Sequence, residues 1–186
     1  MRDPERVAIL ISGRGSNMRA LVERAKGYEV ALVASNKPGA PGLSWASERG
    51  LRTWSLESKG VVKEAFDRQL STALEEHGIG TIALAGFMRI LSPWFVTEWS
   101  GRILNIHPSL LPKYRGLGTH ARAIEAGDRV AGCSVHIVTE ELDAGEVLGQ
   151  AEVPIALDDT PTSLEERVLA AEHALYPRIL SEFVKR

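Results

Sequence analysis

The sequence of 186 residues has a single cysteine, Cys133, and no apolar run approaching the roughly 18 residues that a membrane-spanning helix needs. One cysteine excludes an internal disulfide and fits a reducing cytosol. The N-terminal stretch MRDPERVAILISG passes directly into a strand-like run and is not typical of a signal peptide. The sequence therefore predicts a cytoplasmic protein.

An excess of charge of one sign is also lacking. The chain carries 22 Lys and Arg residues against 24 Asp and Glu residues, for a formal net charge of -2. Proteins that bind nucleic acid or a membrane surface usually carry an excess of basic residues, and this chain has none. Neither partner is therefore expected. The length and the ordinary apolar content of 44% predict one globular domain spanning residues 1–186.

Histidine motifs typical of metal sites are missing as well. The five histidines form no HxH or HExxH pattern, and we expect no metal. A metal-dependent hydrolase using His107, His120, His136 and Asp143 as ligands is a weaker alternative.

Short apolar runs alternate with amphipathic segments along the first half of the chain. Strands are predicted at residues 7–11, 29–36, 52–56, 81–87, 102–107, 133–139 and 146–157. Helices are predicted at residues 16–25, around 47–48, at 62–77 and at 162–184. This order predicts an α/β fold, with a Rossmann-like, mostly parallel twisted sheet flanked by helices and an antiparallel edge from the C-terminal half.

Three polar or irregular segments follow predicted strands, where open α/β sheets bind their ligands. In SGRGSN, Gly13 and Gly15 allow close backbone approach, and Ser16 or Asn17 is expected to cap the next helix. A dinucleotide motif would need a glycine in place of Met18, so the pattern favours a single phosphate over a pyrophosphate. A capped turn without a ligand is the alternative.

The segment GFMRILSPWF places large apolar residues directly after a strand. Such a loop is suited to form an apolar slot for a flat ring, whose edge its backbone groups would bind. Covering the sheet is the alternative role.

The segment NIHPS places Asn105 and His107 on one face at a strand end, because side chains alternate along a strand. An amide beside an imidazole can stabilise the oxyanion of an acyl transfer, whereas a simple Asn–His hydrogen bond would only fix the strand end. Asp143, in a turn after a later strand, is a candidate partner that would orient the ring and favour its protonated form. His136 either points toward the same edge or is a hydrogen-bonded strand residue.

Together the segments ISGRGSN, AGFMRILSP, LNIHPSLLPKYRG, CSVHIVTEELDAG and EHALYP resemble the phosphoribosylglycinamide formyltransferases, which are folate-dependent enzymes of purine biosynthesis. The resemblance covers residues 7–177. The Asn-x-His-Pro-Ser core with a later Asp is shared by other 10-formyltetrahydrofolate enzymes, whereas SGRGSN and the length favour the glycinamide branch.

The resemblance implies that the enzyme transfers a formyl group from 10-formyltetrahydrofolate to the amine of glycinamide ribonucleotide. A 10-formyltetrahydrofolate deformylase, with water as acceptor, is the alternative. The resemblance also implies a phosphate-binding half at about 1–100 and a catalytic and folate-binding half at about 101–186. The sequence does not distinguish a monomer from a homodimer.

The resemblance also implies a role for each group of site residues. The implied catalytic residues are Asn105, His107 and Asp143; glycinamide ribonucleotide would contact Gly15, Ser16, Asn17 and Glu172; and the folate would contact Lys63, Met88, Arg89, Ile90, Leu91 and Asn105. The sequence departs from the pattern of some members at Lys63, where they carry an arginine, and at Ala144, where they carry a glycine, while Arg115 and Gly118 occupy variable positions.

Overall fold

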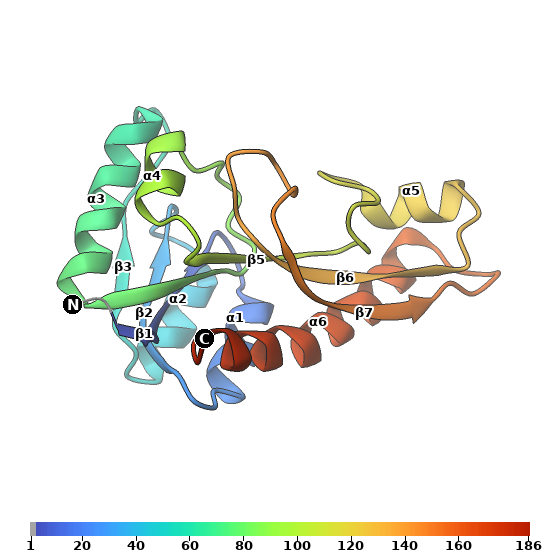
Figure 1. The fold of residues 1–186 in the computed structure, drawn as a ribbon, viewed down its shortest axis with the longest axis horizontal. Helices are drawn as coiled ribbons and strands as arrows, with labels where there is room; N and C mark the ends of the chain where they lie inside the picture. Colours follow the sequence, from blue (N-terminus) through green and yellow to red (C-terminus); the bar gives the residue numbers. More distant parts are fainter. Residues whose placement is uncertain (1–2) are drawn as a thin grey trace.

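The apolar runs form the strands of one seven-stranded sheet (Figure 1). The structure, a computed structural model, describes residues 3–186. The strands are β1 (Asp3–Ile11), β2 (Glu29–Ser35), β3 (Thr53–Ser55), β4 (Ile79–Leu84), β5 (Ile103–His107), β6 (Val130–Ile137) and β7 (Val147–Pro154). The helices are α1 (Ser16–Glu23), α2 (Pro41–Glu48), α3 (Lys63–Glu76), α4 (Pro93–Glu98), α5 (Thr119–Glu125) and α6 (Pro161–Phe183).

The strand order is β3-β2-β1-β4-β5-β6-β7, and the first five of these strands run parallel. The β5–β6 and β6–β7 pairs are antiparallel. This topology confirms the predicted fold class, including the antiparallel edge from the C-terminal half. It also places the carboxyl ends of β1, β4 and β5 next to one another.

Both faces of the sheet are covered, as the uninterrupted apolar sequence of β1 predicts. Val7, Ile9 and Ile11 pack into a core with α1, α2, α5 and α6, whereas Ala8 and Leu10 pack on the opposite face with α3 and α4. Alternation of side chains along the strand therefore divides the core into two layers.

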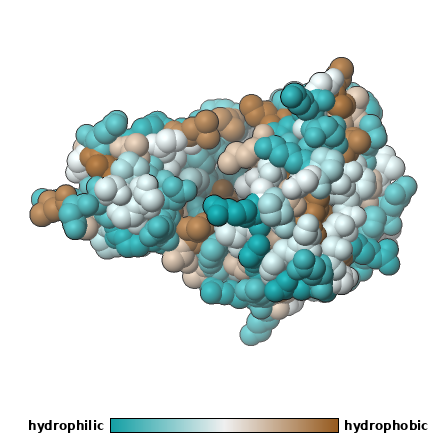
Figure 2. Space-filling model, turned by 180° about the vertical axis from the view of Figure 1, so that it is seen from behind, coloured by the Kyte–Doolittle hydropathy of each residue, from teal (hydrophilic) through white to brown (hydrophobic). Residues whose placement is uncertain are grey.

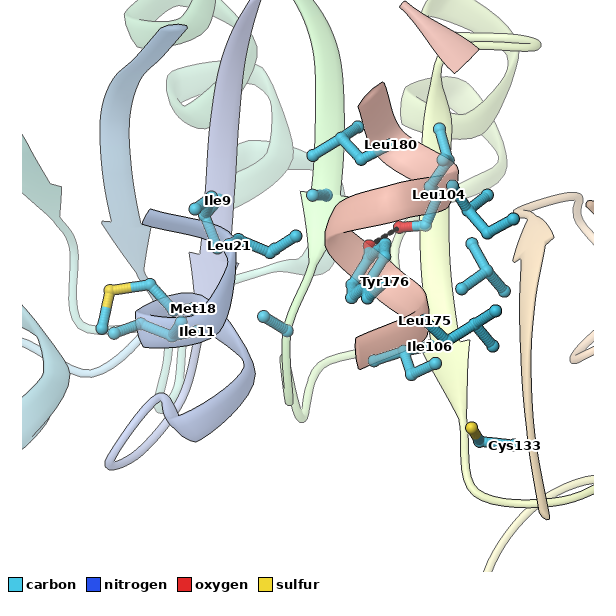
Figure 3. Close-up of a cluster of buried hydrophobic side chains, with 14 of the residues drawn as sticks. Ile9, Ile11, Met18, Leu21, Leu104, Ile106, Cys133, Leu175, Tyr176 and Leu180 are labelled. Atoms are coloured by element: carbon cyan, nitrogen blue, oxygen red, sulfur yellow. Dashed lines mark hydrogen bonds between the residues drawn. The ribbon is translucent and has the colours of Figure 1, made fainter. Parts of the chain in front are cut away.

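Helix α6 is the longest helix and packs against β5, β6 and β7 (Figure 1). Its Tyr176 is fully buried, and its hydroxyl group lies 3.1 Å from each of the carbonyl oxygens of Leu84 on β4 and Leu104 on β5. Figure 3 shows the contact with Leu104. A buried hydroxyl without a partner would cost about 1–3 kcal/mol, so these contacts stabilise the helix on the two central strands.

Two short helices were not predicted from the sequence. Helix α4 begins after Ser92, whose hydroxyl accepts a hydrogen bond from the backbone N–H of Phe95, with Pro93 as its first residue. This Ser-Pro pair is an ordinary helix-start signal. Helix α5 follows Gly118, whose positive φ of 70° ends the preceding loop.

The prediction that Ser16 or Asn17 caps α1 was wrong. Gly15 occupies the N-cap with φ 71°, and no side chain accepts a hydrogen bond there. The side chain of Asn17 instead binds Glu172 of α6. Strand β4 also ends at Leu84, three residues earlier than predicted, because the chain turns at Gly86 with φ 75°.

One face of the molecule is hollowed between the end that carries α5 and the larger body of the sheet (Figure 2). None of the helices between residues 3 and 186 is long and apolar enough to cross a bilayer.

Candidate active site

Asn105 and His107 lie on β5, the last parallel strand of the sheet. Asn105 is half-buried and pairs across to His136 of β6, while His107 is buried and pairs with Ser134. The intervening Ile106 points into the core on the other face. The strand thus directs an amide and an imidazole toward the same side, as its sequence predicts.

Asp143 joins them from the connection between β6 and β7. Its carboxylate Oδ2 lies 3.5 Å from Nδ1 of His107, and its Oδ1 lies 3.6 Å from Nε2 of His136. The backbone N–H of Gly116 donates to the same carboxylate at 2.9 Å. The buried carboxylate therefore accepts a hydrogen bond from Gly116 and lies between the two imidazoles.

The second nitrogen of His107, Nε2, lies 2.9 Å from the carbonyl oxygen of Tyr114. A carbonyl and an ionised carboxylate both only accept hydrogen bonds, so the ring can donate to both only when both nitrogens carry protons. A substrate oxygen can therefore reach the N–H at Nε2 only by sharing or displacing the Tyr114 carbonyl.

Tyr114 and Asp143 are the two non-glycine residues with positive φ between residues 3 and 186, at 55° and 50°. Such backbone conformations usually cost about 1 kcal/mol or more and persist where surrounding contacts enforce them. Both residues contact His107, which makes this cluster the strained part of the described chain.

His136 completes the cluster. Its Nδ1 lies 3.0 Å from the carbonyl oxygen of Ile137, and its Nε2 lies 3.3 Å from Nδ2 of Asn105. Burial lowers the pKa of His136 despite the nearby Ile137 carbonyl and Asp143, so the ring is neutral at pH 7. With its proton on Nδ1, the ring accepts one N–H of the Asn105 amide and leaves the other free for a ligand.

The phosphate-type loop lies at the end of β1. Gly15 has a left-handed backbone, and a side chain there would place its Cβ 2.8 Å from Cε of Met18. The first N–H groups of α1 have no side-chain cap. They remain available to an anion at the positive end of the helix dipole.

Asn17 and Glu172 are buried beside this loop. The Asn17 amide donates to Oε2 of Glu172 at 2.7 Å, while its own Oδ1 is buried without a partner among the described residues. Burial raises the pKa of Glu172 to about 7. The two predicted substrate-binding residues therefore form one buried contact between α1 and α6.

The segment from Gly86 to Ser92 is fixed at both ends. The Ser12 hydroxyl accepts from the Met88 N–H at 2.7 Å and donates to Oδ1 of Asn36 at 2.6 Å. The fully buried Asp67 accepts from the Ser92 N–H at 2.6 Å. Ser12 thereby links the end of β1 directly to the loop that follows β4.

Between these anchors, Met88 and Ile90 are exposed by 73% and 70%, although both are large and apolar. Leu91, by contrast, is buried in the core. The Arg89 guanidinium stacks on Phe66 at 4.8 Å. Two exposed apolar side chains on a fixed loop are suited to contact a flat ring.

The remaining predicted residues lie outside the cluster of Asn105, His107, His136 and Asp143. Lys63 is the first residue of α3 and half-buried. Arg115 forms an exposed ion pair with Glu141 at 2.6 Å, and Gly118 precedes α5. His120 is half-buried, with its Nε2 unpartnered among the described residues, and burial lowers its pKa.

Sequence reasoning gave no role to Tyr114 and Gly116, because both act through backbone groups that leave no side-chain signal. His136 was a candidate from the sequence, because alternation along its strand, on the face it shares with Ser134, could direct it toward the same edge of the sheet. Its place opposite Asn105 depends on strand register, which the sequence alone does not fix. In residues 3–186, no group of three or more His, Cys, Asp or Glu side chains is arranged to hold a metal ion.

The formyl transferase family model matches residues 5–180 of the chain. Phosphoribosylglycinamide formyltransferase of Escherichia coli K12 is 46% identical over 182 residues, which cover 95% of this chain and 86% of that protein. The trifunctional purine biosynthetic protein adenosine-3 of Drosophila melanogaster is also 46% identical, but the chain spans 14% of its length.

Solved structures show the same similarity in three dimensions. The phosphoribosylglycinamide formyltransferase of Brucella melitensis is 47% identical, with a TM-score of 0.92, covering 98% of this chain and 96% of that one. The enzyme of that name from Anaplasma phagocytophilum is 43% identical, with a TM-score of 0.91, covering 97% of this chain and 87% of that one.

We predict that Glu172→Gln makes the protein more stable than the wild type near pH 8 but not near pH 5. The wild-type carboxyl titrates at about 7 when folded and near its ordinary 4.5 when unfolded. Raising the pH through this window therefore favours unfolding, by roughly 3 kcal/mol when complete. Glutamine still accepts from Asn17 and does not titrate.

Urea unfolding at both pH values measures this difference. Glu166→Gln, an exposed substitution on the same helix, is the control and should show no such pH dependence. An equal stability change at both pH values in Glu172→Gln would contradict the buried-carboxyl account.

Proposed function

The chain belongs to the formyl transferase family, and we propose that it acts as a phosphoribosylglycinamide formyltransferase. The enzyme transfers the formyl group of 10-formyltetrahydrofolate to the amine of glycinamide ribonucleotide, giving the N-formyl product and tetrahydrofolate. The observation that carries the proposal is the cluster of Asn105, His107, His136 and Asp143 at the strand ends, beside a phosphate-type loop.

The chemistry requires no covalent enzyme intermediate. The substrate amine attacks the formyl carbon, and the formyl oxygen becomes an oxyanion in the tetrahedral intermediate. The bond from carbon to N10 of the folate then breaks, N10 gains a proton and the new amide nitrogen loses one. Cys133 is not needed as a nucleophile, since it is buried and burial raises the pKa of its thiol to about 12.

The free N–H of Asn105 and an N–H of His107 donate to the oxyanion. His107 supplies the proton for N10, and Asp143, 3.5 Å from its Nδ1, keeps the ring oriented. His136 orients the Asn105 amide through its neutral Nε2. Asn105 and His107 thus act on the reacting group directly, while Asp143 and His136 position them.

The two substrates bind on either side of this cluster. The backbone of Gly15, Ser16 and Asn17 holds the ribose phosphate at the start of α1, and Glu172 contacts the same substrate. The folate ring lies against the loop of Met88, Arg89, Ile90 and Leu91, with Asn105 at its reacting end and Lys63 toward its glutamate tail.

The reaction uses small-molecule substrates and no metal, and we place it in the cytoplasm.

The division into a phosphate-binding half at about 1–100 and a catalytic half at about 101–186 stays a prediction. A deformylase of the same folate differs only in its acceptor, because water replaces the amine. The relatives of similar length and high identity carry the glycinamide activity in their names, which favours the amine.

We predict that loss of the formyl group from the folate requires glycinamide ribonucleotide. With purified protein and 10-formyltetrahydrofolate, tetrahydrofolate should form rapidly when the amine substrate is present and at a negligible rate without it. Absorbance of the folate product measures both rates in one cuvette. Equal rates with and without the amine would identify a deformylase instead.

We further predict that Asn105→Ala lowers kcat by roughly 10²–10³ and that His107→Ala lowers it by about 10²–10⁴, because each removes a donor or acid used in the transition state. Circular dichroism should show that both variants remain folded. His77→Ala, at the far end of α3, is the control and should keep near-normal kcat. A near-normal kcat in either site variant would remove that residue from the mechanism.

A further inference from the structure

One backbone segment, residues 113–116, contacts both members of the His107–Asp143 pair. The carbonyl oxygen of Tyr114 lies 2.9 Å from Nε2 of His107. Two residues later, the N–H of Gly116 donates to the Asp143 carboxylate at 2.9 Å. A shift of this segment, which lies between β5 and α5, would therefore move two hydrogen-bonding groups of the site at once.

The conformation of Tyr114 has to be held by its surroundings. Its φ of 55° lies in the left-handed region, which is unfavourable for a residue with a large side chain and persists where other contacts enforce it. Relaxation to a negative φ would rotate the peptide groups beside Tyr114 and carry its carbonyl oxygen away from His107. The contacts of the Tyr114 side chain therefore bear on the orientation of the imidazole.

The phenol of Tyr114 is anchored on Asp128. Its hydroxyl donates to Oδ2 of Asp128 at 2.7 Å. This contact raises the pKa of Tyr114 and lowers the pKa of Asp128, so at pH 7 the phenol keeps its proton and the carboxylate is charged. A hydrogen bond to a charged acceptor is roughly twice as strong as one between neutral groups.

Asp128 is itself fixed to the frame of the molecule. It lies between α5 and β6, and its backbone N–H donates to the carbonyl oxygen of Ala123 at 3.1 Å. Its carboxylate also accepts from Nζ of Lys113 at 2.9 and 3.0 Å, but the Lys113 side chain is 62% exposed. Because an exposed ion pair contributes little, the phenol is the contact that matters for the segment.

Two further side chains contact the same segment. Arg122 of α5 lies 5.1 Å from the ring of Tyr114 and donates to the carbonyl oxygen of Arg115 at 2.7 Å. The Ser109 hydroxyl donates to the carbonyl oxygen of Lys113 at 2.6 Å. These contacts keep the segment folded, so loss of the phenol contact alone is expected to shift the segment and not to unfold it.

We propose that Asp128 is a positioning residue for His107. Through the Tyr114 hydroxyl it holds the left-handed backbone whose carbonyl oxygen fixes Nε2 of the ring. Its effect on turnover rests on the proposed function, because His107 is the proton donor there. Its effect on the orientation of the ring does not, and can be measured without substrate.

The first experiment measures formyl transfer. Asp128→Ala and Tyr114→Phe should each lower kcat on the order of tenfold, because rate falls steeply when a catalytic group is displaced, while KM for both substrates stays within about twofold. Asp128→Asn still accepts from the phenol and should keep kcat within about threefold of the wild-type value. Lys113→Ala removes the exposed cation from the same carboxylate, and this control should keep a near-normal kcat.

The second experiment observes the imidazole in the absence of substrate. In protein with ¹⁵N-labelled histidine, the proton on Nε2 of His107 should give an NMR signal, because a nitrogen that faces a carbonyl oxygen has to donate. His107→Ala assigns this signal. Exchange of the proton with water should be on the order of tenfold faster in Asp128→Ala and Tyr114→Phe than in the wild type or Lys113→Ala, since the hydrogen bond protects it.

The outcomes separate this proposal from the proposed function. If Asp128→Ala speeds the exchange in a protein that does not transfer formyl groups to glycinamide ribonucleotide, the function fails and the positioning of His107 stands. An unchanged exchange rate in folded Asp128→Ala and Tyr114→Phe overturns the proposal, whatever their kcat values. In a working transferase, a normal kcat in both variants also overturns it. Should Asp128→Ala not fold, Tyr114→Phe, which removes one hydroxyl, decides the question.

Discussion

The carboxylate of Asp143 lies between the imidazoles of His107 and His136, and the rest of the site is arranged around it. A buried carboxylate is costly unless neighbouring groups donate to it, and here the backbone N–H of Gly116 donates at 2.9 Å, while the two imidazoles lie 3.5 Å and 3.6 Å away. The positive φ of Asp143 is the local cost of bringing its side chain to this position. His136, whose pKa is lowered by burial, stays neutral, and its Nε2 can accept an N–H of the Asn105 amide.

The sheet brings these groups together through its change of direction. β5 is the last parallel strand, so its end lies beside the ends of β1 and β4, which lead into the phosphate-type loop and the 86–92 segment. β6 returns antiparallel to β5 and places His136 opposite Asn105. The connection to β7 then supplies Asp143. The Ser12 hydroxyl, which contacts both Met88 and Asn36, links the end of β1 to the 86–92 segment and to the end of β2.

Much of this arrangement could be predicted from the sequence, because the apolar runs and their order specify a mostly parallel sheet with ligand loops at one edge. The antiparallel edge and the shared face of Asn105 and His107 also follow from strand patterns. Other features depend on contacts that no local pattern encodes. Helix α1 begins at Ser16 as predicted, but the predicted side-chain cap is absent, because Gly15 occupies the N-cap and the Asn17 amide donates to the distant Glu172. The backbone contacts of Tyr114 and Gly116 carry no sequence signal, and α4 was missed although Ser92 and Pro93 signal its start.

The most direct measurement of the central claim is a double-mutant cycle on kcat with Asp143→Asn and His107→Ala. Groups that act as one unit give strongly non-additive effects, so the double variant should be little slower than the slower of the two single variants. Single-turnover rates with both substrates bound would isolate the chemical step from binding. If the two losses in rate simply multiply, Asp143 does not act through His107, and the proposed arrangement of charge around the reacting carbonyl is wrong.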